Sequence, residues 1–281
     1  MTSSWSKDYP DREALRREVR CMTDVFIEVL LEIIGEDAIA GVYFKGSAQK
    51  AWDSPVDYVP ELSDVDLHVL FADDADVEKH VGTAEQALRI QSEVERRYFA
   101  KLQEPRHTAR PQLIALNHLE KQEDYLGPAE KTVTTLHGAP PRWGDFADVA
   151  RVRDIARRQL LDLGDYVSKF PFRAIDKPGR YVWELLRHLV WNVSPVGPKV
   201  LILKGVAPTD AWRMNRTAIV DRLRDLSEEP LAADYADFYL AGWDYFLSGY
   251  ADGEAARRAL TSGVSALRRA LDLARTTGRG A

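Results

Sequence analysis

Apolar residues recur at helical or strand spacing along most of the chain. Residues 11–34 keep an apolar helical face, which Gly35 ends. The runs 39–45 and 65–71 are rich in β-branched and aromatic residues, and the second alternates apolar with polar positions. We therefore expect a long helix followed by two strands.

The next seventy residues continue a mixed pattern. Asp73, Asp74 and Asp76 read as a solvated acidic turn. The remaining predicted elements are a helix over 83–102, a third strand over 111–119 and a short strand over 131–136.

Beyond Pro141 the spacing becomes helical throughout. The segment 200–203 is too short to type, and the predicted helices cover 146–163, 180–193, 210–226, 232–250 and 254–276. The expected fold class is therefore α+β. We place one domain over 1–141, with a small mixed sheet and flanking helices, and an all-helical domain over 142–281.

Composition narrows the functional class. The 281 residues suffice for two domains, and no apolar run approaches the roughly 20 residues that span a membrane. The amino-terminal residues lack the apolar region of a signal peptide, so a cytoplasmic location is expected. A single cysteine, Cys21, excludes an internal disulfide and a cysteine-based zinc site. The net charge of −6 argues against a nonspecific nucleic-acid binder.

The second strand carries two carboxylates. Residues two apart in a strand share a face, so Asp64 and Asp66 project together, beside His68. Their like charges repel, and a divalent cation is the usual means of offsetting that repulsion. Mg²⁺ prefers one or two carboxylates together with phosphate oxygens and waters.

The turn after the first strand supplies a phosphate cradle. Gly46 lets backbone N–H groups approach a phosphate closely, and the Ser47 hydroxyl adds a donor. The 16 residues between Ser47 and Asp64 include an insert over 52–60, for which we expect a loop lying over the site.

These two motifs, Phe44-Lys-Gly-Ser47 and Ser63-Asp-Val-Asp-Leu67, resemble the DNA polymerase β-like nucleotidyltransferase superfamily. Their form is most similar to that of the aminoglycoside-type small-molecule members, over about residues 20–120. The resemblance implies Mg²⁺ on Asp64 and Asp66, which are also the first catalytic candidates. It also implies that a nucleoside triphosphate binds at residues Gly46, Ser47, Ser63 and Lys50, and ATP is the donor expected here.

Gln112 departs from the family pattern, which places a third carboxylate on the third strand. A glutamine amide cannot accept a proton at neutral pH. Three alternatives remain open. The base comes from His118, Glu120 or His68, the acceptor needs little activation, or the protein binds nucleotide without turning it over.

The helical domain would hold the acceptor in such an enzyme. Candidates for contacts to the outer phosphates are Lys199 and Lys204, together with Arg187 and Arg213. The predicted reaction moves an NMP, AMP in the first instance, to a hydroxyl of a small molecule, with release of pyrophosphate. The acidic balance suits a cationic acceptor.

The alternatives are a protein-modifying, AMPylating member and a catalytically impaired module that binds nucleotide or a protein. Replacing Asp64 or Asp66 by Asn is expected to abolish turnover. It is also expected to raise the melting temperature without metal, because a like-charge contact is relieved.

Overall fold

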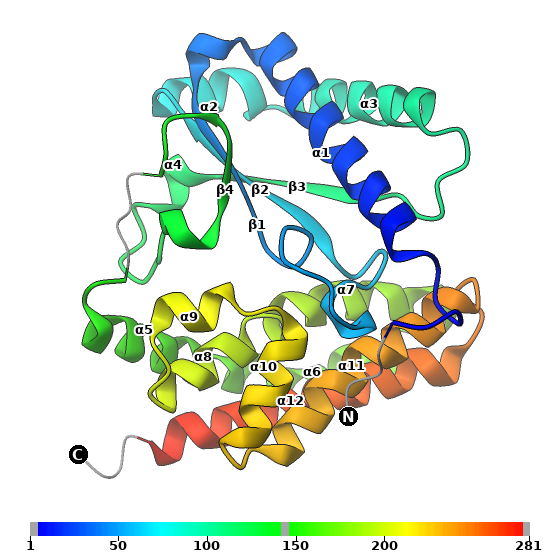
Figure 1. Cartoon of the computed structure of the whole chain (residues 1–281), viewed down its shortest axis with the longest axis vertical. Coiled ribbons are helices and arrows are strands. Elements are labelled where there is room, and N and C mark those ends of the chain that lie inside the picture. Colours follow the sequence, from blue (N-terminus) through cyan, green and yellow to red (C-terminus); the bar gives the residue numbers. More distant parts are fainter. Residues whose placement is uncertain (1–4, 142–145, 278–281) are drawn as a thin grey trace. The chain divides into compact units, whose positions relative to one another are not determined.

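The computed structural model describes residues 5–141 and 146–277 (Figure 1). These residues form two compact units. The sheet unit comprises Ser6–Lys50 and residues 63–141, and the helical unit comprises Trp5, Ala51–Leu62 and residues 146–277. The predicted boundary between residues 141 and 142 falls where a described range ends, and it stays a prediction.

A four-stranded mixed sheet organises the first unit, as predicted. In the order β3-β2-β1-β4, β1 pairs antiparallel with β2 and β4, whereas β2 and β3 are parallel. The strands are β1 (Ile39–Lys45), β2 (Asp64–Phe71), β3 (Arg110–Ala115) and β4 (Thr134–Gly138). The predicted neighbouring strands β1 and β2 therefore lie side by side.

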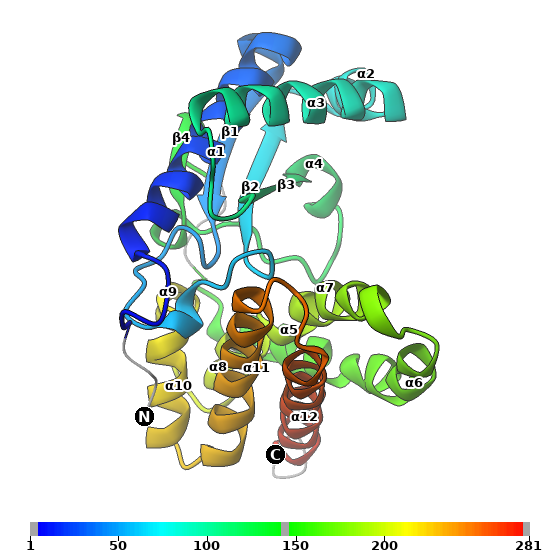
Figure 2. The same ribbon diagram turned by 90° about the vertical axis from the view of Figure 1, so that its right-hand side faces the viewer.

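Helices α1 (Arg12–Ile34) and α3 (Ala84–Lys101) lie side by side on one face of this sheet (Figures 1 and 2). Asp11 accepts a hydrogen bond from the Glu13 N–H at 3.0 Å and caps α1, and Gly35 ends it with φ +98°. The predicted apolar face of α1 is buried, with Ile34 in place of the expected Ile33. The apolar residues that alternate along β2 lie on the face of the sheet that α1 covers.

Two predicted elements are wrong. The third strand stops at Ala115, and the chain continues as the short helix α4 (Leu116–Leu119). The acidic turn is instead the start of helix α2 (Asp74–Val81), because the Asp73 carboxylate accepts from the Asp76 N–H at 2.9 Å. The Asp73 cap accounts for α2, whereas α4 begins without a side-chain cap.

The helical unit contains every remaining α-helix of the described residues. Sequence periodicity missed α6 (Leu163–Ile175), which contains Pro171, and left α8 (Val196–Leu203), which contains Pro198, untyped. The helix predicted over 210–226 is interrupted after Arg213 and begins again at Arg216. The helices are α5 (Val149–Leu161), α6 (Leu163–Ile175), α7 (Val182–Val193), α8 (Val196–Leu203), α9 (Pro208–Arg213), α10 (Arg216–Asp225), α11 (Glu229–Leu247) and α12 (Gly253–Thr276). Among the described residues, no helix is both long and apolar enough to cross a bilayer.

The insert Ala51–Leu62 is a packed part of the helical unit. Trp52 and Tyr58 are both buried and stack with ring centroids 4.2 Å apart. The indole N–H of buried Trp243, on α11, donates to the Pro55 carbonyl at 2.7 Å. The segment expected to be a loop over the site thus has its own aromatic core.

A buried carboxylate fastens this insert to α10. Asp57 is 1% exposed and accepts hydrogen bonds from the backbone N–H groups of Asp53 and Ser54, at 2.7 and 3.0 Å. It also accepts from the Thr217 N–H at 2.8 Å and the Thr217 hydroxyl at 2.7 Å. Four donors therefore depend on one side chain.

We expect Asp57→Ala to destabilise the helical unit by about 3 kcal/mol, because it leaves buried donors without an acceptor. Urea unfolding followed by tryptophan fluorescence measures this, since every described tryptophan belongs to the helical unit. Asp221→Asn, at an exposed position on α10, is the matched control and should change stability by less than about 0.5 kcal/mol. Equal losses of stability in the two variants would contradict this role of Asp57.

A second buried carboxylate positions the entry to β3. Glu18, on α1, accepts from the Arg106 N–H at 2.9 Å and lies 2.6 Å from Nδ1 of buried His107. Burial by itself raises the pKa of Glu18, but the hydrogen bonds from His107 and Arg106 outweigh it, and the pKa lies below its ordinary value of 4.5. The ionised form of Glu18 therefore stabilises the fold.

A lowered pKa in the folded state means that this stabilisation is present above pH 4.5 and is lost as the pH falls through the lower folded value. Acid titration monitored by circular dichroism should show wild type losing stability more steeply below about pH 4.5 than Glu18→Gln. Glu28→Gln, an exposed position on the same helix, should follow the wild-type profile.

Candidate active site

Asp64 and Asp66 stand at the start of β2 and, by alternation along the strand, project to the face of the sheet opposite α1 and α3. The intervening Val65 and the following Leu67 are fully buried on the helix-covered face. The Asp64 side chain is 7% exposed, whereas Asp66 is half-buried. The pleat of β2 thus brings the two carboxylates together, as the spacing predicts.

The Gly46 turn lies directly against this pair. Lys45, the last residue of β1, is the register partner of Asp66, and Gly46 follows with φ +81°. A Cβ atom at position 46 would come within 1.9 Å of Asp66 Oδ2. Only glycine permits both this backbone conformation and this close approach. The structure therefore brings Gly46 and the adjoining Ser47 to the carboxylates.

Gln112 occupies the neighbouring position on β3, in register with Asp66. We assign its amide with the NH₂ end toward the carboxylates, where it donates to Asp64 Oδ2 at 3.2 Å and to Asp66 Oδ1 at 3.1 Å. One atom thus contacts both acids, so the two carboxylates converge on a common point. Gln112 stands at the place where the resemblance leads one to expect a third carboxylate.

Arg110 is the residue that sequence reasoning missed. Its Nε donates to Asp64 Oδ1 at 2.9 Å, and its Nη2 lies 2.5 Å from Asp64 Oδ2. This two-pronged pairing neutralises the more buried acid. The signal was available in principle, because Arg110 precedes Gln112 by two residues and therefore shares its strand face.

The other charged groups near the pair are shifted toward neutrality. Burial lowers the pKa of Lys45, and the charge of Asp66 opposes that shift. Burial and the nearby Lys45 lower the pKa of His68 to about 2. His68 Nδ1 lies 3.3 Å from the Tyr125 hydroxyl. A histidine with so low a pKa is a weak base, which disfavours His68 among the base candidates.

The strand face that was expected to unite His118 and Glu120 does not exist. His118 lies on α4 with Nε2 3.9 Å from Glu78 Oε1, and both side chains are half exposed or more. Glu120 caps the carboxyl end of α4. A role for either residue as the base stays a prediction.

Of the remaining nucleotide-binding candidates, Lys50 and Ser63 belong to the sheet unit, and Lys199 and Lys204 belong to the helical unit. Ser63 is buried directly before Asp64, and the Lys50 carbonyl accepts from Arg16 at 2.9 Å. In the helical unit, burial lowers the pKa of Lys199 to about 8 against the attraction of Asp162, and Lys204 pairs with Glu228. A phosphate role for these lysines stays a prediction.

Two arginines of the helical unit hold backbone of the insert. Arg187, a candidate for phosphate contact, donates to the carbonyls of Glu61 and Leu62. Arg216 donates to the Val56 carbonyl at 3.1 Å and stacks on Tyr239, with 3.9 Å between guanidinium and ring centroid. Both contacts fix the insert within the helical unit, and a phosphate role for Arg187 stays a prediction.

The donor set fits Mg²⁺ rather than a metal that needs a full protein cage. Among the described residues, no group of three or more His, Cys, Asp or Glu side chains forms a metal cluster. Mg²⁺ needs only one or two carboxylates when phosphate oxygens and waters complete its shell. Asp64 and Asp66 converge as that role requires, and Asp64 would exchange its Arg110 contact for the metal.

Comparison of the chain with protein-family models, with curated proteins and with solved structures finds no match. The interpretation of the site therefore depends on its own geometry.

The Arg110 contact reverses the stability effect expected for Asp64. In metal-free buffer, Asp64→Asn should lower the melting temperature, by an amount equivalent to about 1 kcal/mol, because an ion pair with a half-exposed arginine is lost. Arg110→Met should cost a similar amount, and the double variant should cost less than the sum. A melting temperature that rises in Asp64→Asn would show that carboxylate repulsion dominates.

Proposed function

We propose that this protein is a Mg²⁺-dependent nucleotidyltransferase that moves an NMP, AMP in the first instance, from a nucleoside triphosphate to a hydroxyl group. The observation that carries the proposal is the Gly46 turn packed against Asp66, whose carboxylate converges with that of Asp64. A backbone turn open to phosphate and an acid pair facing it are the two parts that triphosphate chemistry requires.

In this reaction the acceptor oxygen forms a bond to the α-phosphorus, the bond from that phosphorus to the bridging oxygen breaks, and pyrophosphate leaves. The hydroxyl proton passes to a base or to solvent. Bound Mg²⁺ would supply charge stabilisation for the phosphate oxygens. The chain's own part is positioning, which is the larger share of catalysis in phosphoryl transfer.

Each residue of the site has an assigned role. The backbone N–H groups after Gly46 and the Ser47 hydroxyl would bind the phosphates, and Asp64 and Asp66 would hold the metal. Gln112 donates to both acids and fixes their orientation. Arg110 balances Asp64 before nucleotide arrives and is then available for a phosphate oxygen.

A small hydroxylated acceptor with positive charge suits the net charge of −6. A protein side chain as acceptor is the second choice. Among the described residues, no side chain distinguishes a small-molecule acceptor from a protein acceptor. A panel of acceptors tests which of the two is used.

A specific observation favours a second candidate, a nucleotide-binding module without turnover. Gln112 cannot act as a base, and Arg110 already fills the cation-binding role at Asp64. Such a protein would bind ATP through Gly46 and Ser47 and signal its presence through another surface.

Pyrophosphate release from ATP, measured with and without Mg²⁺ across aminoglycosides, other polyhydroxylated amines and peptides, tests the enzyme. Asp66→Asn should lower the rate about a hundredfold or more, because a charge that faces the transferring phosphate is lost. Asp37→Asn, an exposed acid of the same unit, should leave the rate unchanged.

Gln112→Glu separates the two candidates. A wild-type protein that binds ATP without releasing pyrophosphate, and a Gln112→Glu variant that gains release, would establish the binding module. Release by wild type that is lost in Asp66→Asn would establish the enzyme. If ATP and Mg²⁺ neither bind nor raise the melting temperature, both proposals fail.

A further inference from the structure

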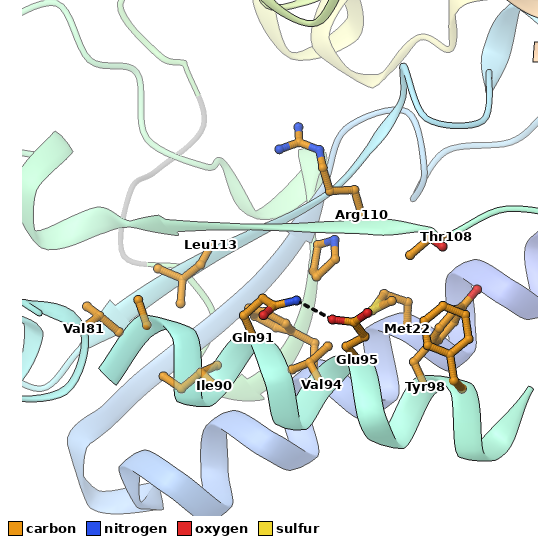
Figure 3. Close-up of a pocket in the computed structure, with 14 residues that line it drawn as sticks. Met22, Val81, Ile90, Gln91, Val94, Glu95, Tyr98, Thr108, Arg110 and Leu113 are labelled. Atoms are coloured by element: carbon orange, nitrogen blue, oxygen red, sulfur yellow. Dashed lines mark hydrogen bonds between the residues drawn. The ribbon is translucent and has the colours of Figure 1, made fainter. Parts of the chain in front are cut away.

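The sheet unit contains a cavity between its helices and the edge strand β3, with a volume of about 460 Å³ (Figure 3). That volume lies within the range of small-molecule sites. Most of the lining is aliphatic or aromatic, and the side chains that dominate it are Met22, Phe26, Ile90, Val94, Tyr98 and Leu113. Residues of α1, α3 and β3 line it, and α1 packs on α3.

The cavity lies on the other side of β3 from the candidate active site. Pro111 and Leu113 line it, as does Arg110, whereas Gln112 does not. Figure 3 shows the Arg110 guanidinium pointing away from the cavity, where it pairs with Asp64. The positive charge of Arg110 is therefore not offered to a ligand in the cavity.

One negatively charged side chain lies at the cavity. Glu95 is the only acid among the described residues that line it, and its side chain is exposed at the surface of α3. Gln91 Nε2 donates to Glu95 Oε2 at 2.7 Å, one turn away on the same helix (Figure 3). Figure 3 shows this carboxylate beside Met22, and the hydrogen bond from Gln91 uses only one of its two oxygens.

We propose that this cavity binds a small ligand with an apolar body and a cationic head. The body, about the size of two fused six-membered rings, fills the space between Ile90, Val94 and Leu113. The head, an ammonium or amidinium group, donates to Glu95. An anionic ligand is disfavoured, because Glu95 would repel it and Arg110, the one cation among the described lining residues, is paired with Asp64.

Calorimetric titration of the whole protein with 1-naphthylmethylamine, 1-naphthylmethanol and 1-naphthoate tests the proposal. The ammonium form should bind about two- to fivefold more tightly than the alcohol, and the carboxylate more weakly than either. Glu95→Gln should reduce amine affinity to that of the alcohol and leave alcohol binding unchanged. Glu85→Gln, which removes an exposed charge from the same helix outside the cavity, should change neither.

A matched pair of exposed alanines on α3 tests the location. Ala87 lines the cavity and Ala100 does not. Ala87→Leu should weaken binding of both amine and alcohol on the order of tenfold by filling the space, whereas Ala100→Leu should not. These binding measurements test the cavity proposal whether or not the protein transfers nucleotides.

Three results would overturn the proposal. They are an absence of binding by all three probes, equal effects of Ala87→Leu and Ala100→Leu, and amine affinity that is unchanged in Glu95→Gln. Concentration-dependent dimerisation that Ala87→Leu abolishes would also overturn it, because a second copy would then cover the cavity and the exposed Phe99 beside it.

Discussion

Two acidic side chains on one face of a largely buried strand are the constraint around which the sheet unit is built. Their repulsion would cost stability, and the strand alongside offsets it with a guanidinium on Asp64 and an amide that reaches both acids. Because β2 and β3 are parallel and in register, Arg110 and Gln112 fall opposite Asp64 and Asp66 without any bulge. The pair is therefore preformed and convergent before any metal binds.

The turn that faces this pair is equally constrained. The positive φ of Gly46 and the proximity of Asp66 Oδ2 leave no room for a side chain there. A turn with that geometry presents backbone donors rather than bulk, which is what a phosphate needs. The same arrangement is compatible with catalysis and with simple nucleotide binding. Gln112 is the residue whose chemistry separates these two functions.

The chain leaves the sheet unit after Lys50 and returns at Ser63, and the intervening segment belongs to the helical unit. Asp57, Arg187 and Arg216 anchor that segment, so the link between the Gly46 turn and the acid pair is a folded element. These charged groups hold backbone in place through several hydrogen bonds, although Arg187 looks in the sequence like a candidate for phosphate binding.

Local pattern was enough to determine α1, the strands β1 and β2, the shared face of Asp64 and Asp66, and the helical character of the second half. These features follow from apolar positions that recur about every 2 residues in strands and about every 3.6 residues in helices, and the sequence alone shows this recurrence. Tertiary structure decided the rest: the pairing of Arg110 with Asp64, the end of β3 before His118, the burial of the 51–62 insert, and the cavity behind β3. Each of these depends on which strand or helix lies alongside. Spacing along the sequence does not show which elements become neighbours, because side chains far apart in sequence meet only when the sheet and helices pack.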